Sequence, residues 1–410
     1  MVRTAHPTNL DRADRLSRSR YHQRISKTGA DYPDFDRVKS PRRIQLQGQV
    51  VSETDETVRE IRINPIVPSE SVLVATARGM RPRDAEERIE RNTEAHVDRC
   101  PVCTGNEDKT PPTILAVPNE KDWVIRIVEN LYPVLGDDRT ASGINFGLQQ
   151  AIEGYGRHEV IIDHNNHGIA IHEMAVTHLS TLFQTYRARM KQLYDSDERL
   201  KYVLIFKNFG EAAGASIKHT HSQIIAMPVV PENVYNEITH SRNYYQKNHQ
   251  CIFCAMIDEA LTFEATIYDR NSGEIRRRVD VGQYVVERGD KFIAIKPFAS
   301  RYEWEVHILP LQHQSDFINS TDEDMADFAS VLKRTMSRLD HVIGGAQYNF
   351  FLHSQPHGDA CADCPPSYHW HLEICPRTSI PTGFELGSGL FVSTISPEDA
   401  AAQLRAVSLD

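Results

Sequence analysis

The chain lacks a long apolar run and an excess of positive charge, and only seven of its 410 residues are cysteine. A membrane-spanning helix needs about 18 or more consecutive apolar residues, so we expect no membrane span. The net charge of −10 argues against broad nucleic-acid binding. No basic start followed by an apolar segment is found, so we expect no secretory signal.

Six of the seven cysteines form Cys-x-x-Cys pairs. Pairs of this kind are typical of thiolate metal ligands in a reducing compartment rather than of disulfides, and we therefore expect a cytoplasmic protein. The third pair, Cys361 and Cys364, lies in a loop rich in Gly, Pro and Asp. Both a loop metal site and a pair of reduced cysteines fit that setting.

The length and the 40% hydrophobic content fit two globular lobes of about 150 residues each with an additional tail. We predict a basic tail at residues 1–55, which is disordered or docks on a partner subunit. The first lobe then spans residues 56–235 and carries the catalytic groups, and the second spans residues 236–410.

Two sets of cysteines and histidines recur at nearly equal spacing, which suggests a duplicated unit with one metal site per copy. The first set is Cys100, Cys103, His167 and His219, and the second is Cys251, Cys254, His313 and His369. Zinc favours four tetrahedral N or S ligands, so the sequence predicts two structural zinc sites. The alternative is a collection of unrelated buried cysteines and surface histidines.

The most informative segment is residues 210–223, where a turn of small residues precedes His219 and His221. Side chains two apart on a strand point the same way, so the two imidazoles can face one site. Small residues let backbone N–H groups approach a phosphate, and Ser216 and Gln223 can hydrogen-bond phosphoryl oxygens. Because imidazole is a nucleophile near neutral pH, the segment predicts chemistry at phosphorus.

Short β-rich runs and two amphipathic segments predict an α+β fold, with a mostly antiparallel sheet and a packed helix in each lobe. The expected strands are 72–76, 123–128, 159–163, 202–206, 284–287, 292–295, 306–309, 348–352 and 371–374. The expected helices are 177–196 and 322–342.

Several segments occur together in an order that resembles the galactose-1-phosphate uridylyltransferase branch of the histidine-triad superfamily, including its members that resemble ADP-glucose phosphorylase. They are residues 78–82, 100–103, 156–167, 208–216, 219–223, 368–377, 383–389 and 397–405. The resemblance spans roughly residues 60–408 and implies two tandem histidine-triad-like lobes, a homodimer, and a nucleotide sugar and a sugar 1-phosphate as substrates.

The resemblance also implies roles for individual residues. His221 would attack the α-phosphorus of the nucleotide sugar and form a nucleotidyl-histidine, from which a second sugar phosphate takes the nucleotide. Zinc at His219 would brace the strand that carries this nucleophile. The implied substrate contacts are Gln223, Asn208 and Ser216 to phosphoryl oxygens, Arg78 and Arg81 as positive charge, and Glu385 to the hexose hydroxyls.

Thr220 separates the two histidines, where uridylyltransferases usually carry proline and adenylyl-transferring relatives carry threonine. The nucleotide base is therefore left open. Three functions stay under consideration: a nucleotidyltransferase between sugar 1-phosphates, a phosphorylase or hydrolase of ADP-sugars or dinucleoside polyphosphates, and a zinc-stabilised binding protein without activity.

His371 and Glu373 occupy the positions in the second copy that match His221 and Gln223. This copy has no preceding turn of small residues, and we expect Trp370 to crowd a phosphate there. The second copy is therefore predicted to be structural. His158 is expected to be solvated or hydrogen-bonded rather than catalytic.

Overall fold

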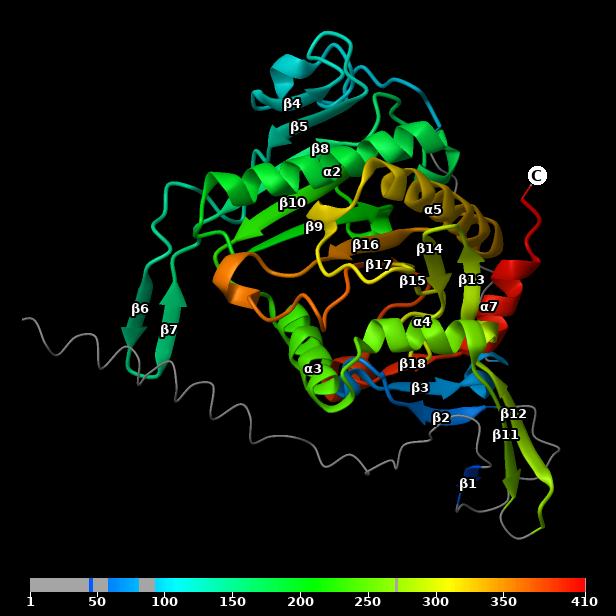
Figure 1. Cartoon of the computed structure of the whole chain (residues 1–410). Coiled ribbons are helices and arrows are strands. Elements are labelled where there is room, and N and C mark those ends of the chain that lie inside the picture. The colour runs from blue at the N-terminus through cyan, green and yellow to red at the C-terminus, as the bar shows by residue number, and fades with distance from the viewer. Residues whose placement is uncertain (1–43, 47–57, 81–92, 270–271, 410) are drawn as a thin grey trace, which may run out of the picture. The chain divides into compact units, whose positions relative to one another are not determined.

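The computed structural model describes residues 44–46, 58–80, 93–269 and 272–409 (Figure 1). Apart from three residues, the predicted tail at 1–55 lies outside the described part. The chain divides into two compact units, residues 1–47 with 265–277 and residues 48–264 with 278–410. The described part of the first unit centres on a three-stranded sheet in the order β1-β11-β12, formed by β1 (Ile44–Leu46), β11 (Glu264–Asp269) and β12 (Ile275–Asp280).

The second unit is built on a ten-stranded sheet in which every neighbouring pair is antiparallel. Five strands come from the first half of the chain, in the spatial order β4 (Thr113–Val117), β5 (Ile125–Glu129), β8 (Arg157–Ile162), β10 (His221–Met227) and β9 (Tyr202–Phe209). The other five come from the second half, in the order β13 (Val285–Arg288), β14 (Phe292–Ile295), β15 (Val306–Pro310), β17 (His371–Pro376) and β16 (Tyr348–His353).

The two sets of five strands have the same topology. In each set the spatial order of the strands is the same as their order along the chain, except that the last two are interchanged. One long helix precedes the innermost strand in the chain, α2 (Val176–Ser196) before β9 and α5 (Asp322–Ile343) before β16. The innermost strands β9 and β16 pair with each other and join the halves into a single sheet, with Asn208 opposite Asn349. The α+β class and the duplication are thereby confirmed, whereas the lobe boundary at residue 235 stays a prediction.

Helices α2 and α5 cover one face of the sheet (Figure 1). Both bury an apolar stripe at helical spacing against the strands, and α5 starts at the capping box of Thr321 and Asp324. The aromatic centre of this core is Phe328, whose ring lies 4.7 Å from that of Phe183 and 5.3 Å from that of Phe292. Both helices were predicted, α2 from its periodicity and α5 from the repeated order of elements.

The opposite face is covered unevenly. Helices α3 (Glu232–Asn248) and α4 (Ile252–Thr262), which were not predicted, pack apolar side chains against β14 and β15 of the second half. The remaining elements are a sheet of β2 (Arg59–Arg62), β3 (Val72–Ala75) and β18 (Phe391–Ser393), a hairpin of β6 (Gly143–Phe146) and β7 (Gln149–Ile152), and helices α6 (Gly383–Ser388) and α7 (Pro397–Ala406). On the first half, this face therefore retains room for a cavity beside β10.

Among the described residues, no helix combines the length and the apolar character that crossing a membrane would require.

The core between the helices and the sheet makes a first prediction. We expect Phe328→Ala to cost about 3–5 kcal/mol, because it removes a fully buried ring and leaves a cavity. Thermal unfolding followed by circular dichroism measures the effect. Phe146→Ala is the matched control, since 58% of that side chain is exposed and we expect a change within about 0.5 kcal/mol. Equal losses in the two variants would contradict this account of the core.

Candidate active site

The first predicted metal set is assembled in the structure. Cys100, Cys103, His167 and His219 are all buried, and their possible ligand atoms lie within 4.8 Å of one another. The Nδ1 atom of His219 is 3.8 Å from the Sγ of Cys100 and 3.4 Å from the Sγ of Cys103. Zinc bonds of about 2.3 Å to sulfur and about 2.0–2.1 Å to nitrogen, at tetrahedral angles, place these atoms about 3.6 Å apart. The geometry fits a four-coordinate ion.

The second set repeats this arrangement. The Sγ of Cys254 lies 3.3 Å from the Nδ1 of His313 and 3.7 Å from that of His369, and Cys251 completes the group. The two imidazoles are close to perpendicular in both sets, at 77° in the first and 79° in the second. The duplication thus extends to the side chains that could hold a metal ion.

Backbone carbonyls fix the tautomer of the ligating histidines. The Nε2 of His219 donates to the carbonyl of His164 at 2.7 Å, and the Nε2 of His369 donates to that of Pro310 at 2.9 Å. A carbonyl only accepts, so Nε2 carries the proton and the lone pair of Nδ1 faces the cysteine sulfurs. Burial lowers the pKa of His219 to about 4, which keeps this ring neutral.

The same logic identifies the free nitrogen of His221. Its Nδ1 donates to the carbonyl of His219 at 2.8 Å, which leaves the lone pair on Nε2. Burial, followed by the charge of Lys207, lowers the pKa of His221, so the ring is an uncharged base. His221 lines a cavity of about 880 Å³, within the size range of small-molecule sites. The imidazole is therefore held with one nucleophilic atom available.

The turn of small residues lies at the wall of this cavity. Gly210 has φ +89°, and a Cβ atom there would lie 2.4 Å from the side chain of Gln347, so only glycine fits. The Oε1 of Gln347 accepts a hydrogen bond from the backbone N–H of Ala212 at 2.7 Å. Asn208 and Ser216 line the same cavity as His221, so the structure brings these three predicted residues together.

Gln223 follows on the same strand and is held by His158. The backbone N–H of Val134 donates to the Nδ1 of His158 at 3.2 Å, so the Nε2 of that ring carries the proton and donates to the Oε1 of Gln223 at 2.9 Å. The NH2 group of Gln223 is then the other end of its carboxamide, and Gln223 is not among the described residues that line the cavity of His221. His158 is hydrogen-bonded, as expected.

A buried ion pair that the sequence analysis missed lies beneath the nucleophile. The Nζ of Lys207 donates to Asp163 at 2.7 Å and to the hydroxyl of Thr220 and the carbonyl of His221, each at 2.9 Å. The Asp163 carboxylate also accepts from the hydroxyl of Ser222 at 2.9 Å. Both charged side chains are fully buried, and they hydrogen-bond the carbonyl of His221 and the hydroxyls of its two neighbours, Thr220 and Ser222.

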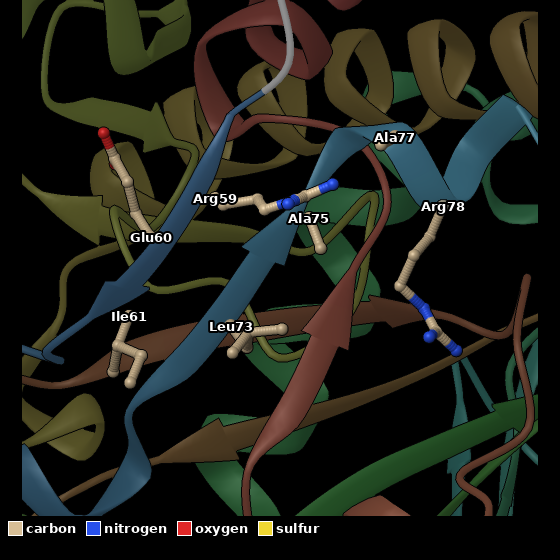
Figure 2. Close-up of a pocket in the computed structure, with 7 residues that line it drawn as sticks. All are labelled: Arg59, Glu60, Ile61, Leu73, Ala75, Ala77 and Arg78. Atoms are coloured by element: carbon tan, nitrogen blue, oxygen red, sulfur yellow. The ribbon is translucent and has the colours of Figure 1, made fainter. Parts of the chain in front are cut away.

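The remaining predicted substrate residues lie elsewhere. Arg78 lines a surface hollow of about 540 Å³ beside β2 and β3, together with Arg59 (Figure 2). The pKa of Glu385 is lowered: burial opposes the shift, and hydrogen bonds from Thr382 and the charge of Arg78 outweigh it. Neither Arg78 nor Glu385 is among the described residues that line the cavity of His221. Arg81 lies outside the described residues.

The second copy repeats the histidine geometry without an open site. The Nδ1 of His371 donates to the carbonyl of His369 at 3.1 Å, but its Nε2 faces Glu373 at 3.4 Å and Glu237 at 4.0 Å. The expectation that Trp370 crowds this position is wrong. Residues alternate in direction along the chain here, and Trp370 points into the helix-covered core, where its ring lies 5.1 Å from Phe317.

The third cysteine pair also differs from expectation. Cys361 and Cys364 are joined as a disulfide, whereas the sequence suggested either a metal site or two reduced thiols. The other five cysteines are free, as the composition indicated.

Comparisons with known proteins agree with this geometry. The family described as galactose-1-phosphate uridyl transferase, N-terminal domain, matches residues 49–231. An ADP-glucose phosphorylase from Arabidopsis thaliana is 29% identical over 353 residues, which cover 85% of this chain and 93% of that protein. A galactose-1-phosphate uridylyltransferase from Thermotoga maritima is 27% identical over 361 residues, covering 86% and 99%.

Solved structures show the same relationship. The crystal structure of the Arabidopsis thaliana ADP-glucose phosphorylase with bound ADP-glucose superposes with a TM-score of 0.70 at 27% identity, covering 86% of this chain and all of that one. A uridylyltransferase structure gives a TM-score of 0.62 at 25% identity, covering 84% and 97%. These matches confirm the resemblance that the motifs indicated: the chain is similar to galactose-1-phosphate uridylyltransferases and to an ADP-glucose phosphorylase, and residues 49–231 match the model of the uridyl transferase N-terminal domain.

Proposed function

We propose that this protein is a nucleotidyltransferase that moves a nucleoside monophosphate between sugar 1-phosphates through a nucleotidyl-His221 intermediate. One observation carries the proposal: the Nε2 of His221 is left unprotonated at a cavity of about 880 Å³ that Asn208 and Ser216 also line. The similarity to the uridylyltransferase of Thermotoga maritima supports it.

In the proposed reaction the Nε2 lone pair of His221 attacks the α-phosphorus of the nucleotide sugar. A P–N bond forms while the bond to the bridging oxygen breaks, and that oxygen leaves with its electron pair as part of the sugar 1-phosphate. An oxygen of the second sugar 1-phosphate then attacks the same phosphorus and restores the imidazole. The hydroxyl of Ser216 and the NH2 groups of Asn208 and Gln223 hydrogen-bond the phosphoryl oxygens as charge develops on them.

Phosphorolysis of an ADP-sugar is the second candidate, in which inorganic phosphate replaces the accepting sugar phosphate. The similarity to the ADP-glucose phosphorylase of Arabidopsis thaliana favours it, as does Thr220 between the two histidines. Both reactions share the first step at His221 and differ only in the second nucleophile.

We further propose that both Cys/His sets hold zinc. Each set offers two thiol sulfurs and two imidazole nitrogens, and backbone carbonyls hold the rings of His219, His313 and His369, which suits a closed structural site. Zinc at His219 would fix the backbone carbonyl that orients His221. The metal supplies rigidity to the strand.

The proposed assembly is a cytoplasmic homodimer in which Arg78, Arg81 and Glu385 serve the active site of the partner subunit. The charge of Arg78 helps to lower the pKa of Glu385, and neither residue lines the cavity of its own His221. Next to Glu385, 50% of Phe384 and 78% of Leu386 are exposed, which leaves apolar surface for such a contact.

The covalent intermediate gives the most direct test. Incubation with radiolabelled UDP-glucose, ADP-glucose or diadenosine tetraphosphate, followed by quenching, should leave acid-labile label on the protein. The nucleotide that labels identifies the donor. His221→Gly should abolish labelling, because the attacking nitrogen is removed, while His371→Gly should retain it. Normal labelling of His221→Gly would overturn the assignment of the nucleophile.

The acceptor distinguishes the two candidate reactions. Once labelled, the protein should release its nucleotide as nucleotide sugar when galactose 1-phosphate or glucose 1-phosphate is added. Release as nucleoside diphosphate by inorganic phosphate, with no response to sugar phosphates, would instead establish the phosphorylase.

Metal content tests the duplicated sites. We expect about two zinc ions per chain, and about one in Cys100→Ser or in Cys254→Ser, since each substitution removes one thiolate ligand. Elemental analysis of the purified variants measures this, and Cys100→Ser should also weaken labelling at His221. Cys375→Ala, which removes a buried thiol outside both sets, is the control and should retain both ions. Two ions in Cys100→Ser would refute the first site.

A further inference from the structure

The second half of the chain contacts a predicted phosphate ligand, Asn208, through Asn349 on β16. Asn349 is paired with Asn208 in the register of β9 and β16. Figure 1 shows these two strands side by side in the large sheet. Its Nδ2 donates two hydrogen bonds, one to the Oδ1 of Asn208 at 2.8 Å and one to the backbone carbonyl of Ala213 at 2.9 Å. One carboxamide thus bridges a predicted phosphate ligand and the turn of small residues.

The backbone determines how both carboxamides are oriented. The carbonyl of Ala213 can only accept, so the end of Asn349 that faces it has to be the NH2 group. The second hydrogen of that NH2 group points to Asn208, which therefore presents its oxygen to β16. The NH2 group of Asn208 is then the end that is left for the cavity shared with His221. The two hydrogen bonds of Asn349, to the carbonyl of Ala213 and to the oxygen of Asn208, thus fix the direction in which the NH2 group of Asn208 points.

We propose that Asn349 is a positioning residue of the active site, which orients the carboxamide of Asn208 so that its NH2 group faces the substrate phosphates. The inference rests on the proposed function, in which Asn208 binds a phosphoryl oxygen. A phosphoryl oxygen accepts and does not donate, so only one of the two amide orientations binds it. Asn349 contacts no substrate atom in this account and acts through Asn208.

The neighbouring Gln347 supports the same arrangement from the same segment. It accepts from the backbone of Ala212 and also lines the cavity of His221. Asn349 and Gln347 thus hold the turn at two successive points, Ala213 and Ala212. The second copy has lost an open site of its own around His371, but its innermost strand completes the site of the first copy.

Two substitutions separate orientation from simple packing. Asn349→Asp keeps the shape of the side chain but replaces the NH2 group by an acceptor. Asn208 should then rotate to donate to the introduced carboxylate, which turns its own oxygen toward the phosphates. Asn349→Leu is similar in size and uncharged, and it leaves Asn208 free to rotate. We expect kcat/KM to fall about 10- to 100-fold in Asn349→Asp, the range for one hydrogen bond to a charged group, and by less in Asn349→Leu.

A double-mutant cycle with Asn208→Ala tests whether the effect passes through Asn208. The initial rate of nucleotidyl-His221 formation from ADP-glucose and UDP-glucose gives kcat/KM for each variant, and thermal unfolding verifies that each is folded. In the Asn208→Ala background, Asn349→Asp and Asn349→Leu should each change kcat/KM by less than about twofold. Losses that multiply would overturn the inference, because they would show that Asn349 acts by its charge or by packing. If one of the two Asn349 variants fails to fold, the cycle with the other variant is sufficient for the test.

The outcomes also separate this inference from the proposed function. If Asn208→Ala labels as fast as the unaltered protein, Asn208 has no phosphate role and the inference fails, while labelling at His221 still supports the proposed function. Asn248→Asp is the matched control: the Nδ2 of Asn248 donates to a backbone carbonyl in α3, outside the cavity, and labelling should be unchanged. A loss there equal to that in Asn349→Asp would likewise count against the inference.

Discussion

A single hydrogen bond between neighbours in sequence, from the Nδ1 of His221 to the carbonyl of His219, determines which imidazole nitrogen can react. The orientation of the His221 ring is therefore only as fixed as the carbonyl group that accepts this hydrogen bond. That carbonyl belongs to a residue whose own ring is tied to the sulfurs of Cys100 and Cys103 and to the backbone of His164. The metal set, the strand and the nucleophile therefore form one rigid chain of contacts, in which each member fixes the next.

The second copy shows that this bond alone is insufficient for a site. His371 makes the equivalent bond to His369, and His369 lies in an equivalent set of cysteines and histidines. The difference lies in what covers the sheet: α3 and α4 pack over the second half, and the carboxylates of Glu237 and Glu373 occupy the space beside the ring. Duplication produced two oriented imidazoles, of which His221 lines the cavity of about 880 Å³ and His371 faces two carboxylates.

Most of the fold could be predicted from local patterns in the sequence. Periodicity predicted α2, the repeated order of elements predicted α5, and runs of β-branched and aromatic residues predicted most strands of the ten-stranded sheet. The spacing of cysteines and histidines predicted both candidate metal sets. Each of these signals is contained in a short segment or a repeat. The error over Trp370 could have been avoided from the sequence, because a residue between two histidines on a strand points away from both. The partners of the site could not be predicted in this way. His158, Lys207 and Asn349 are 65, 14 and 141 residues from the groups they hold, and only the sheet register brings them together.

The buried pair of Lys207 and Asp163 gives a physical meaning to Thr220, the residue that departs from the proline of uridylyltransferases. Burying two charges costs several kcal/mol each, and their attraction offsets this only if the remaining donors find acceptors. Burial lowers the pKa of Lys207, and Asp163 counteracts that shift. The three protons of the ammonium group are matched by three acceptors: the carboxylate of Asp163, the carbonyl of His221 and the hydroxyl of Thr220. Proline at position 220 would remove the third acceptor and leave a buried donor unpaired, so threonine and Lys207 belong together. The hydrogen bond to Lys207 therefore gives threonine at position 220 a structural role that does not depend on which nucleotide base is bound.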